Sequence, residues 1–249
     1  MRVIAVTNQK GGVGKTTTVV NLGAGLNNLG RKVLIVDMDP QGNATTHLGF
    51  NPDEIEVSIY DVLKGTATVN DAKVEVRPGL DLIPSNIELS GAEIDLVNAI
   101  GREGLLKDAL SRIRRYDYVL IDCPPSLGIL TINALVACKE VFIALQPEFF
   151  ALKGVRKLLD TVTLVKTRMN RRLDITGVII CLYDKRRNLT KEVSEQIREF
   201  FGDKVFETVI HNNVALAEAP INGNDIFFYE PKSRGAVDYK SFTNEVDDA

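Results

Sequence analysis

Short runs of β-branched and other apolar residues alternate with longer amphipathic segments along nearly the whole chain. The runs at 119–121 and 178–180 lack the alternating polar positions of a half-exposed strand, which indicates strands covered by helices on both faces. Strands and helices in this order are typical of β-α units. The sequence therefore predicts an α/β fold, with a mostly parallel β-sheet and helices on both faces.

The expected elements can be placed along the chain. Strands are predicted at 3–7, 33–37, 80–84, 118–122, 141–145, 175–181 and 205–210. Helices are predicted at 15–29, 104–114, 151–169, 189–201 and 234–246, and Gly30 is expected to end the first of them as a C-cap. Segment 51–79 is the least regular and is expected to hold loops and a short helix. With no repeat or linker, we expect one domain over residues 1–249.

Composition excludes several classes of protein. A chain with 45% hydrophobic and 25% charged residues is globular, and a net charge of −3 predicts no nucleic-acid or membrane partner by itself. Cys123, Cys138 and Cys181 are far apart and form no C-x-x-C pair, which favours a reduced, cytosolic protein. No export signal and no apolar stretch of about 20 residues is present. We therefore expect a cytoplasmic protein.

A glycine-rich turn, Gln-Lys-Gly-Gly-Val-Gly-Lys-Thr-Thr, occupies residues 9–17 between the first expected strand and the first helix. Backbone N–H groups in such a turn can surround a phosphate, and the helix dipole favours the same anion. Lys15 is expected to reach the β and γ phosphates, and the Thr16 hydroxyl to bind Mg²⁺. The predicted nucleotide-binding residues here are Lys10, Gly11, Gly12, Val13, Gly14, Lys15, Thr16 and Thr17. A turn that serves only the backbone is the structural alternative, and a dinucleotide fingerprint would need glycine in place of Thr17.

Carboxylates follow two of the expected strands. Because the carboxyl ends of parallel strands share one edge, these side chains should face the phosphate turn. Asp122 is expected to hold Mg²⁺ through a water molecule, since magnesium keeps much of its hydration shell. Asp37 is either a turn acceptor or an indirect contributor near the metal. Asp39 lies on the same side of the extended chain.

The turn departs from the ordinary Walker A spacing, because Gln9 replaces a glycine and Lys10 follows it. The Lys-Gly-Gly-Val-Gly-Lys-Thr pattern resembles the deviant Walker A motif of the ParA/MinD superfamily. The resemblance covers nearly the whole chain and extends to the ParA/Soj partition ATPases. Segments that resemble further motifs of that family lie at 37–43, 123–126, 146–152, 188–190, 213–220 and 230–236.

The resemblance implies specific roles for residues and partners. Lys10 would contact the nucleotide of a partner subunit, Asp39 would position or deprotonate the attacking water, and Asn213 would lie near the adenine. Lys10, Lys15 and Asp39 are thus the predicted catalytic residues. The family implies ATP and Mg²⁺ as cofactors and slow hydrolysis that a ParB-type partner accelerates. It also implies a homodimer in the ATP state that binds DNA non-specifically, associates with the nucleoid and drives chromosome or plasmid partition.

Two positions depart from the family in a segment implicated in DNA binding. Asn212 and Ala215 stand where family members commonly carry arginine. Segment 153–191 offers a compensating charge, because it holds eleven lysines and arginines against three aspartates. Lys185, Arg186 and Arg187 are the predicted DNA contacts, with a solvated helix face and loop as the structural alternative.

Other functions remain open on the sequence alone. They are a ParA relative that positions another cargo, a nucleotide-gated interaction module with weak or no DNA binding, and a ligase that phosphorylates a carboxylate. A MinD-like membrane ATPase would need a basic amphipathic C-terminal helix, whereas residues 244–249 are acidic. An iron–sulfur carrier would need a second cysteine to join Cys123. His47 and His211 lack metal-ligand spacing and are left unassigned.

Overall fold

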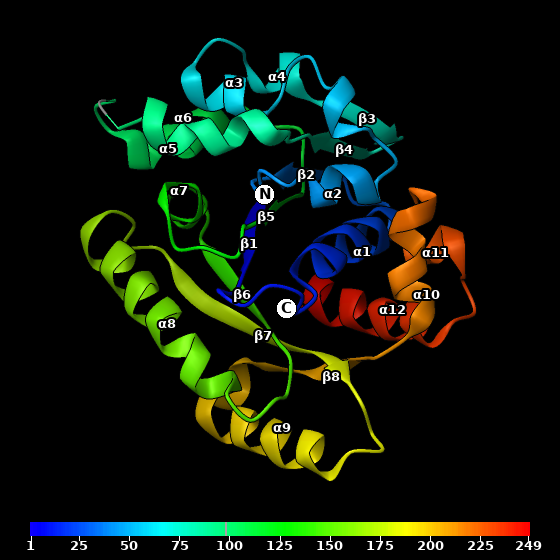
Figure 1. Cartoon of the computed structure of the whole chain (residues 1–249). Helices are drawn as coiled ribbons and strands as arrows, with labels where there is room; N and C mark the ends of the chain where they lie inside the picture. Colours follow the sequence, from blue (N-terminus) through cyan, green and yellow to red (C-terminus); the bar gives the residue numbers. More distant parts are fainter. Residues whose placement is uncertain (98) are drawn as a thin grey trace.

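The computed structural model describes residues 1–97 and 99–249. Within them, eight strands form one sheet in the order β3-β4-β2-β5-β1-β6-β7-β8 (Figure 1). Paired strands run parallel except β3 and β4, which are antiparallel. The strands are β1 Arg2–Thr7, β2 Val33–Asp37, β3 Val74–Arg77, β4 Leu80–Ile83, β5 Tyr118–Asp122, β6 Glu140–Leu145, β7 Asp174–Tyr183 and β8 Val205–His211. The predicted α/β fold with a mostly parallel sheet is confirmed.

Helices connect the strands and cover both faces of the sheet. The α-helices are α1 Lys15–Asn28, α2 Asn43–His47, α3 Ile59–Lys64, α4 Val69–Ala72, α5 Ala92–Asp95, α6 Leu105–Ser111, α7 Ile129–Ala137, α8 Ala151–Arg168, α9 Asn188–Phe201, α10 Val214–Glu218, α11 Ile226–Tyr229 and α12 Arg234–Asp247. The 3₁₀ helices are η1 Pro52–Glu54, η2 Ile87–Gly91, η3 Arg102–Gly104, η4 Gly202–Lys204 and η5 Ala219–Asn222. Within the described part of the chain, none of these helices has the length and apolar character required to cross a bilayer.

Segment 51–79 is more regular than predicted. It contains η1, two short α-helices and the edge strand β3 in place of loops and one helix. Each α-helix starts with a capping box, in which Ser58 pairs with Asp61 and Thr68 with Asp71. Reciprocal side-chain bonds to the first turn stabilise helices too short to show an apolar stripe.

Helix α7 was not predicted from the sequence. Its sequence is apolar on almost every side, since the residues at 129–137 read Ile-Leu-Thr-Ile-Asn-Ala-Leu-Val-Ala. The helix packs against α6, α8 and β1, which buries Leu130, Ala134 and Leu135. A helix surrounded by other elements has no polar face, so the helical period is missing from its sequence.

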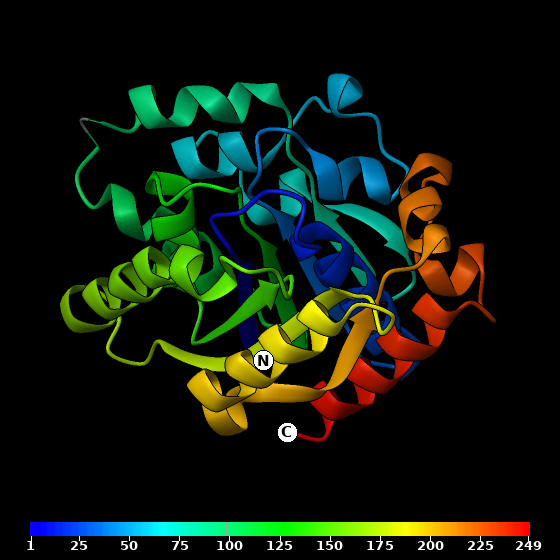
Figure 2. The same ribbon diagram turned by 60° about the horizontal axis from the view of Figure 1, so that its bottom comes forward.

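Alternate residues of β1 belong to different cores. Val3 and Ala5 pack with apolar residues of α3, α6, α7, α8 and α9, whereas Ile4 and Val6 pack with those of α1, α2, α11 and α12. Figure 2 shows α8 and α12 on opposite sides of the strands. Both cores depend on strands that are buried throughout, as the uninterrupted apolar runs predict.

Helix α1 is fixed at both ends and along its length. Arg31 N–H donates to Leu26 O and Gly30 N–H donates to Asn27 O, a Schellman arrangement in which Gly30 has φ +82°. At Gly25, a Cβ atom would lie 2.2 Å from Thr243 Oγ1 of α12. The close contact with α12 fixes the helix whose N-terminus follows the glycine-rich turn.

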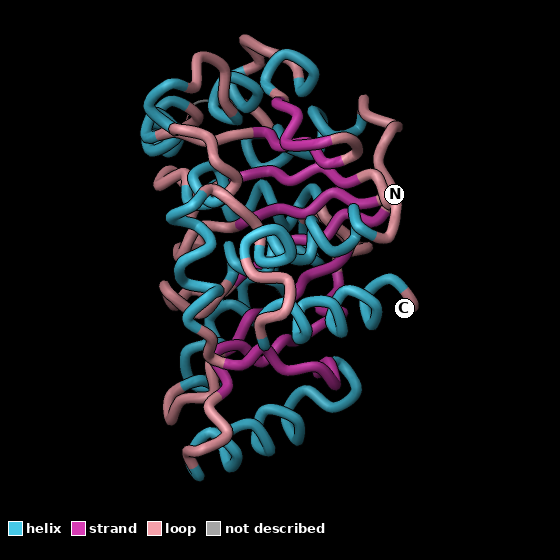
Figure 3. The backbone as a smooth tube through the Cα atoms, turned by 90° about the vertical axis from the view of Figure 1, so that its right-hand side faces the viewer, coloured by secondary structure: helices cyan, strands magenta, loops and turns pink. Residues whose placement is uncertain are grey.

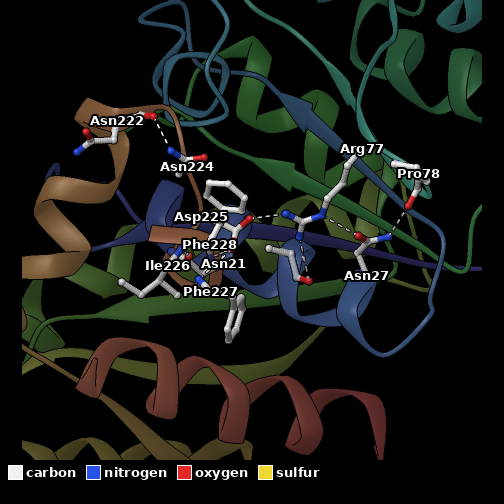
Figure 4. A network of polar contacts seen from close by, with 11 residues as sticks. Asn21, Asn27, Arg77, Pro78, Asn222, Asn224, Asp225, Ile226, Phe227 and Phe228 are labelled. Atoms are coloured by element: carbon white, nitrogen blue, oxygen red, sulfur yellow. Dashed lines mark hydrogen bonds and ion pairs between the residues drawn. The ribbon is translucent and has the colours of Figure 1, made fainter. Parts of the chain in front are cut away.

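A partly buried polar network ties α1 to the segment that follows β8 (Figure 4). Arg77 donates to Asn27 Oδ1 and to Asp225 Oδ2, and Asp225 is 4% exposed. Asn21 Oδ1 accepts the N–H of Ile226 at 2.8 Å. These bonds hold the C-terminal part of the chain against the first helix.

The two ends of the described chain lie on the same side of the molecule (Figure 3). Arg2 Nη1 donates to Val246 O, and Arg31 forms an ion pair with Asp247 at 2.9 Å. The opposite edge of the sheet, where β1, β2 and β5 end, is thereby left to the glycine-rich turn and the carboxylates.

Candidate nucleotide site

A cavity of about 450 Å³ lies at the carboxyl edge of the sheet. The residues predicted from sequence that line it are Gly11, Gly12, Gly14, Lys15, Thr16, Thr17, Asp39 and Asn213. Further lining residues, including His47, Cys181, Leu216 and Tyr239, were not predicted as site residues. The sequence around these four residues gives no sign of a binding site, since each residue type is also common in protein cores or turns. The cavity thus joins the first helix to the segment after β8.

The glycine-rich turn has the backbone geometry that requires glycine. Gly12 has φ +72° and Gly14 has φ +93°, both in the left-handed region. A Cβ atom at Gly11 or Gly12 would meet nothing within 4 Å, so the turn is open on its outer side. Helix α1 starts at Lys15 without a side-chain cap, and its first-turn N–H groups therefore remain available to an anion.

Lys15 is a buried cation at the start of α1. It is 6% exposed, and its Nζ donates to Lys10 O at 3.2 Å. Burial lowers the pKa of Lys15, opposed by the nearby charge of Asp122. Among the described residues, no carboxylate forms a salt bridge with it. A buried ammonium group without a direct counter-ion is well suited to receive phosphate oxygens.

Thr16 and Asp122 meet between α1 and β5. Thr16 Oγ1 donates to Asp122 Oδ2 at 2.7 Å, and Asp122 is fully buried. Burial raises the pKa of Asp122 well above its ordinary value, and the neighbouring Asp37 adds to the effect. Its Oδ1 has no hydrogen-bond partner within the part of the chain that the structure describes. An unpartnered carboxylate oxygen beside a threonine hydroxyl fits the oxygen ligands that Mg²⁺ prefers.

Asp37 and Asp39 have different surroundings. Asp37 Oδ2 accepts Thr45 N–H and Thr45 Oγ1 at 2.9 and 2.8 Å, and Oδ1 accepts Asp39 N–H at 3.1 Å. Burial raises the pKa of Asp37 to about 6. Its geometry is that of a turn acceptor, the first of the two predicted alternatives. Asp39 lines the cavity, and its Oδ1 accepts Gln41 N–H at 3.0 Å.

Asn213 supplies the far wall of the cavity. It is the N-cap residue of α10, yet its side chain accepts no capping hydrogen bond. Its Oδ1 is buried and, over residues 1–97 and 99–249, has no hydrogen-bond partner. An amide in this state can bind the polar edge of a base. The adenine contact that the family resemblance implies for Asn213 stays a prediction.

Lys10 lies outside this cavity. It borders a neighbouring hollow of about 510 Å³ together with Val13, Gln146 and Glu148. Its Nζ donates to Glu148 Oε2 at 2.5 Å and to Gln146 Oε1 at 3.2 Å. Val13, also predicted to bind the nucleotide, is 1% exposed and borders this hollow instead of the cavity. The structure thus brings most of the predicted residues of one subunit together at the cavity, and it separates Val13 and Lys10 from them.

The predicted DNA contacts lie in the turn between β7 and α9. Arg186 forms a bidentate pair with Asp184, and Arg187 Nε lies 3.5 Å from Asp184 Oδ2. Hydrogen bonds from Arg186 lower the pKa of Asp184 to about 2. The side chains of Arg186 and Arg187 are still 83% and 77% exposed. Asp184 therefore offsets one of the three positive charges, and the cations remain accessible.

Both histidines have structural surroundings. His211 Nδ1 lies 2.9 Å from Asp238 Oδ2. His47 is 2% exposed, and burial lowers its pKa from 6.5 to about 4.

The buried His47 predicts a loss of stability in acid. Because the pKa of His47 is depressed in the folded state, the unfolded chain takes up a proton at this residue first as the pH falls below 6.5. The corresponding loss of stability is complete near pH 4. We expect about 2 to 3 kcal/mol of unfolding free energy to be lost this way. The unfolding free energies of the wild type and of His47→Gln, measured by urea denaturation between pH 7.5 and 4.5, check this prediction. Protonation of Asp37 changes the unfolding free energy in the opposite direction to protonation of His47, and it does so equally in both proteins. Its effect therefore cancels when the two pH profiles are subtracted. Parallel profiles of the wild type and His47→Gln would contradict the assignment.

A β-strand that leads into a glycine-rich turn, with the turn's lysine buried near a carboxylate on the neighbouring strand, is the arrangement of P-loop ATPases. The family described as an AAA domain matches residues 1–175. The sporulation initiation inhibitor protein Soj of Bacillus subtilis is 51% identical over 98% of this chain and 98% of its own length. The chromosome partitioning protein ParA of Caulobacter vibrioides is 48% identical over 99% of this chain and 94% of its own length. The chain belongs to the ParA/Soj family of ATPases, which confirms the resemblance found in the sequence.

The fold also matches solved structures. A Mycobacterium smegmatis protein described as cobyrinic acid a,c-diamide synthase, with bound ADP and magnesium, superposes with a TM-score of 0.87. It is 40% identical and covers 98% of this chain and 93% of its own. The identity is lower than for Soj and ParA.

Proposed function

We propose that the chain is an ATPase that binds MgATP in the 450 Å³ cavity, forms a homodimer in that state and binds DNA non-specifically as the dimer. A ParB-type partner would stimulate hydrolysis, and the cycle would serve chromosome or plasmid partition. The supporting observation is the buried Lys15 at the start of α1, beside a Thr16–Asp122 pair with an unpartnered oxygen in the described structure. The proposed setting is cytoplasmic, with association to the nucleoid in the ATP state.

The residues of one subunit divide the work on the nucleotide. Backbone N–H groups of the turn and the Lys15 ammonium group hold the phosphates, and Asn213 holds the base. Thr16 and Asp122 would hold Mg²⁺, which would supply positive charge beside the phosphates. Asp39 orients the attacking water and accepts its proton. Asp37 keeps Asp39 in place through the bond to its N–H group.

We also propose that residues 1–249 act as one domain. The family match ends at residue 175, whereas Asn213 and Leu216 line the same cavity as the glycine-rich turn. The network from Arg77 to Asp225 connects the two parts. A nucleotide site that draws its walls from both parts supports a single working unit.

The dimer is tested at Lys10. We expect Lys10→Ala to bind ATP as tightly as the wild type but to form no ATP-dependent dimer, because each subunit loses the charge that it lends to its partner's phosphates. Sedimentation velocity with and without ATP measures the dimer, and a fluorescent ATP analogue measures binding. A full-strength dimer in Lys10→Ala would refute the role, and Lys191→Ala, an exposed lysine outside the site, is the control.

DNA binding is tested by a salt titration. We expect DNA to be retained in low salt with ATP and released without it, and the triple variant Lys185→Ala, Arg186→Ala, Arg187→Ala to reduce the slope of log K against log salt by roughly two to three. Retention on a DNA-coated surface gives both quantities. No retention in either nucleotide state would leave the ATPase and remove DNA binding, as expected for a nucleotide-gated interaction module.

A ligase that phosphorylates a carboxylate is the second candidate, because the M. smegmatis structure that is 40% identical is described as a diamide synthase with bound ADP and magnesium. Transfer of labelled phosphate from ATP to a small carboxylate would favour it, whereas release of free phosphate alone favours the ATPase. Lys10 argues for the ATPase, because a ligase that completes its site in one subunit needs no lysine directed to a partner.

A further inference from the structure

We infer that Glu148 holds the Lys10 ammonium group within its own subunit and so sets the protein concentration at which two subunits pair. The inference rests on the proposed role of Lys10 in the dimer. Lys10 Nζ lies 2.5 Å from Glu148 Oε2 and 3.2 Å from Gln146 Oε1. Both acceptors belong to the segment between β6 and α8. Glu148 is therefore a positioning residue for Lys10 and an intramolecular competitor of the partner's phosphates.

The backbone of Lys10 is fixed by hydrogen bonds, whereas its side chain is half exposed and is held only at its ammonium group among the described residues. Its N–H donates to Asn8 Oδ1 at 3.0 Å, and Asn8 Nδ2 donates to Ala144 O at 2.7 Å. Lys10 O accepts the bond from Lys15 Nζ. The side chain is 51% exposed, and beyond its backbone these two acceptors alone hold it within the described residues. Lys10 can thus leave Glu148 by changing rotamer, without refolding of the turn.

The Lys10 ammonium group cannot contact Glu148 and the partner's phosphates at the same time. The group carries one charge, and against Glu148 that charge is already compensated. Once Lys10 turns to the partner, the Glu148 carboxylate remains unpaired near the partner's triphosphate, and like charges repel. The loss of the ion pair and the repulsion from the triphosphate both oppose dimer formation. Both disappear when Glu148 is neutral.

The proposed role of Lys10 in the partner's site makes a second copy of the chain the expected occupant of this face, and the side chains next to Glu148 have the character of an interface. Phe149 and Phe150 follow it directly, are 74% and 66% exposed, and stack edge to face with centroids 4.9 Å apart. Phe150 lines the hollow that Lys10 borders. Neighbouring aromatic side chains exposed to this degree are typical of protein interfaces. The Lys10–Glu148 pair therefore lies on the face that the proposed dimer would cover.

The expected effect on dimer formation is moderate, and its free energy doubles because each dimer contains two such pairs. A pair of this exposure changes an equilibrium by roughly two- to fivefold. Two such pairs open for each dimer that forms, so their factors multiply. We expect neutralisation of Glu148 to lower the dimer dissociation constant by roughly 4- to 25-fold.

The test compares Glu148→Gln with wild type in full-length protein. Gln keeps the shape and one acceptor but removes the charge. Sedimentation velocity over a protein dilution series, in saturating AMPPNP and about 0.05 M salt, gives the dimer dissociation constant. Binding of the same nucleotide to dilute monomer is measured in parallel and should not change. The matched control is Glu192→Gln, an exposed carboxylate on α9 with no ion pair in the described structure.

Four results decide the matter. Tighter pairing of Glu148→Gln, with a gap that closes in about 1 M salt, supports the inference because salt screens an exposed pair. Equal or weaker pairing, while the wild type dimerises, overturns the inference and leaves the proposed function intact. An equal gain in Glu192→Gln also overturns it, because the effect is then one of net charge. No nucleotide-dependent dimer in any protein refutes both the inference and the proposed dimer.

Discussion

Lys15→Met is expected to reduce ATP turnover by about 10² to 10³-fold, the largest loss that we predict for a single side chain. The lysine is 94% buried at the head of α1, and among the described residues its polar contact is the Lys10 carbonyl. Its charge therefore has no strong partner in the protein itself. Removing it deprives the phosphates of a cation at the point where negative charge accumulates during transfer.

The same substitution should leave the fold unharmed. Burial lowers the pKa of Lys15, so folding disfavours its charged form, and methionine of similar length removes that penalty. We expect a thermal midpoint equal to or above that of the wild type, measured by circular dichroism beside steady-state phosphate release. Lost activity together with a melting point lowered by many degrees would show that Lys15 acts on the structure rather than on the nucleotide.

Asp39→Ala is expected to lower the rate of ATP hydrolysis by about 10²-fold or more while nucleotide affinity stays within a few-fold of the wild type. Asp39 is 7% exposed and lines the cavity, and among the described residues its side chain accepts one hydrogen bond, from Gln41 N–H. Since it contributes no positive charge, its loss should spare the bound state. Single-turnover kinetics and equilibrium binding separate the two quantities.

Asp39→Asn is the matched control for the bond to Gln41. The amide oxygen can still accept that N–H group but cannot take a proton from water. Equal loss in the alanine and asparagine variants supports the proton-accepting role. Full activity in Asp39→Asn would assign the residue to the turn alone. Asp37→Asn should differ, because Asp37 bonds three groups of the turn, and we expect it to lower stability as well.

The nucleotide site was largely predictable from sequence because its signal is local. Glycines 12 and 14, Lys15 and Thr16 are adjacent in the chain, and Asp122 ends an apolar strand that had to lie in the same sheet. Side chains such as Leu216 and Tyr239 reach the cavity only through tertiary packing. Their positions depend on how α10 and α12 dock, which no short pattern encodes.

Other features escaped prediction for different physical reasons. Helix α7 is buried on nearly all sides and so lacks an amphipathic period. Strand β3 lies at the edge of the sheet and has only four residues, which is too short for an alternating pattern of apolar and polar residues to stand out. The pairing of Arg186 with Asp184 depends on the geometry of a turn, and a count of charges along the sequence gives only their sum.

The cavity draws one wall from residues 11–17 and another from residues 212–220, so almost the entire chain separates its halves. During translation, the glycine-rich turn emerges from the ribosome long before its opposite wall exists. A nascent chain should therefore acquire full affinity for nucleotide only after residues 212–220 have been synthesised and folded. Bound nucleotide would then hold these two distant segments of the polypeptide together, and at about 100 times its dissociation constant it would add about 2.7 kcal/mol to the free energy of unfolding.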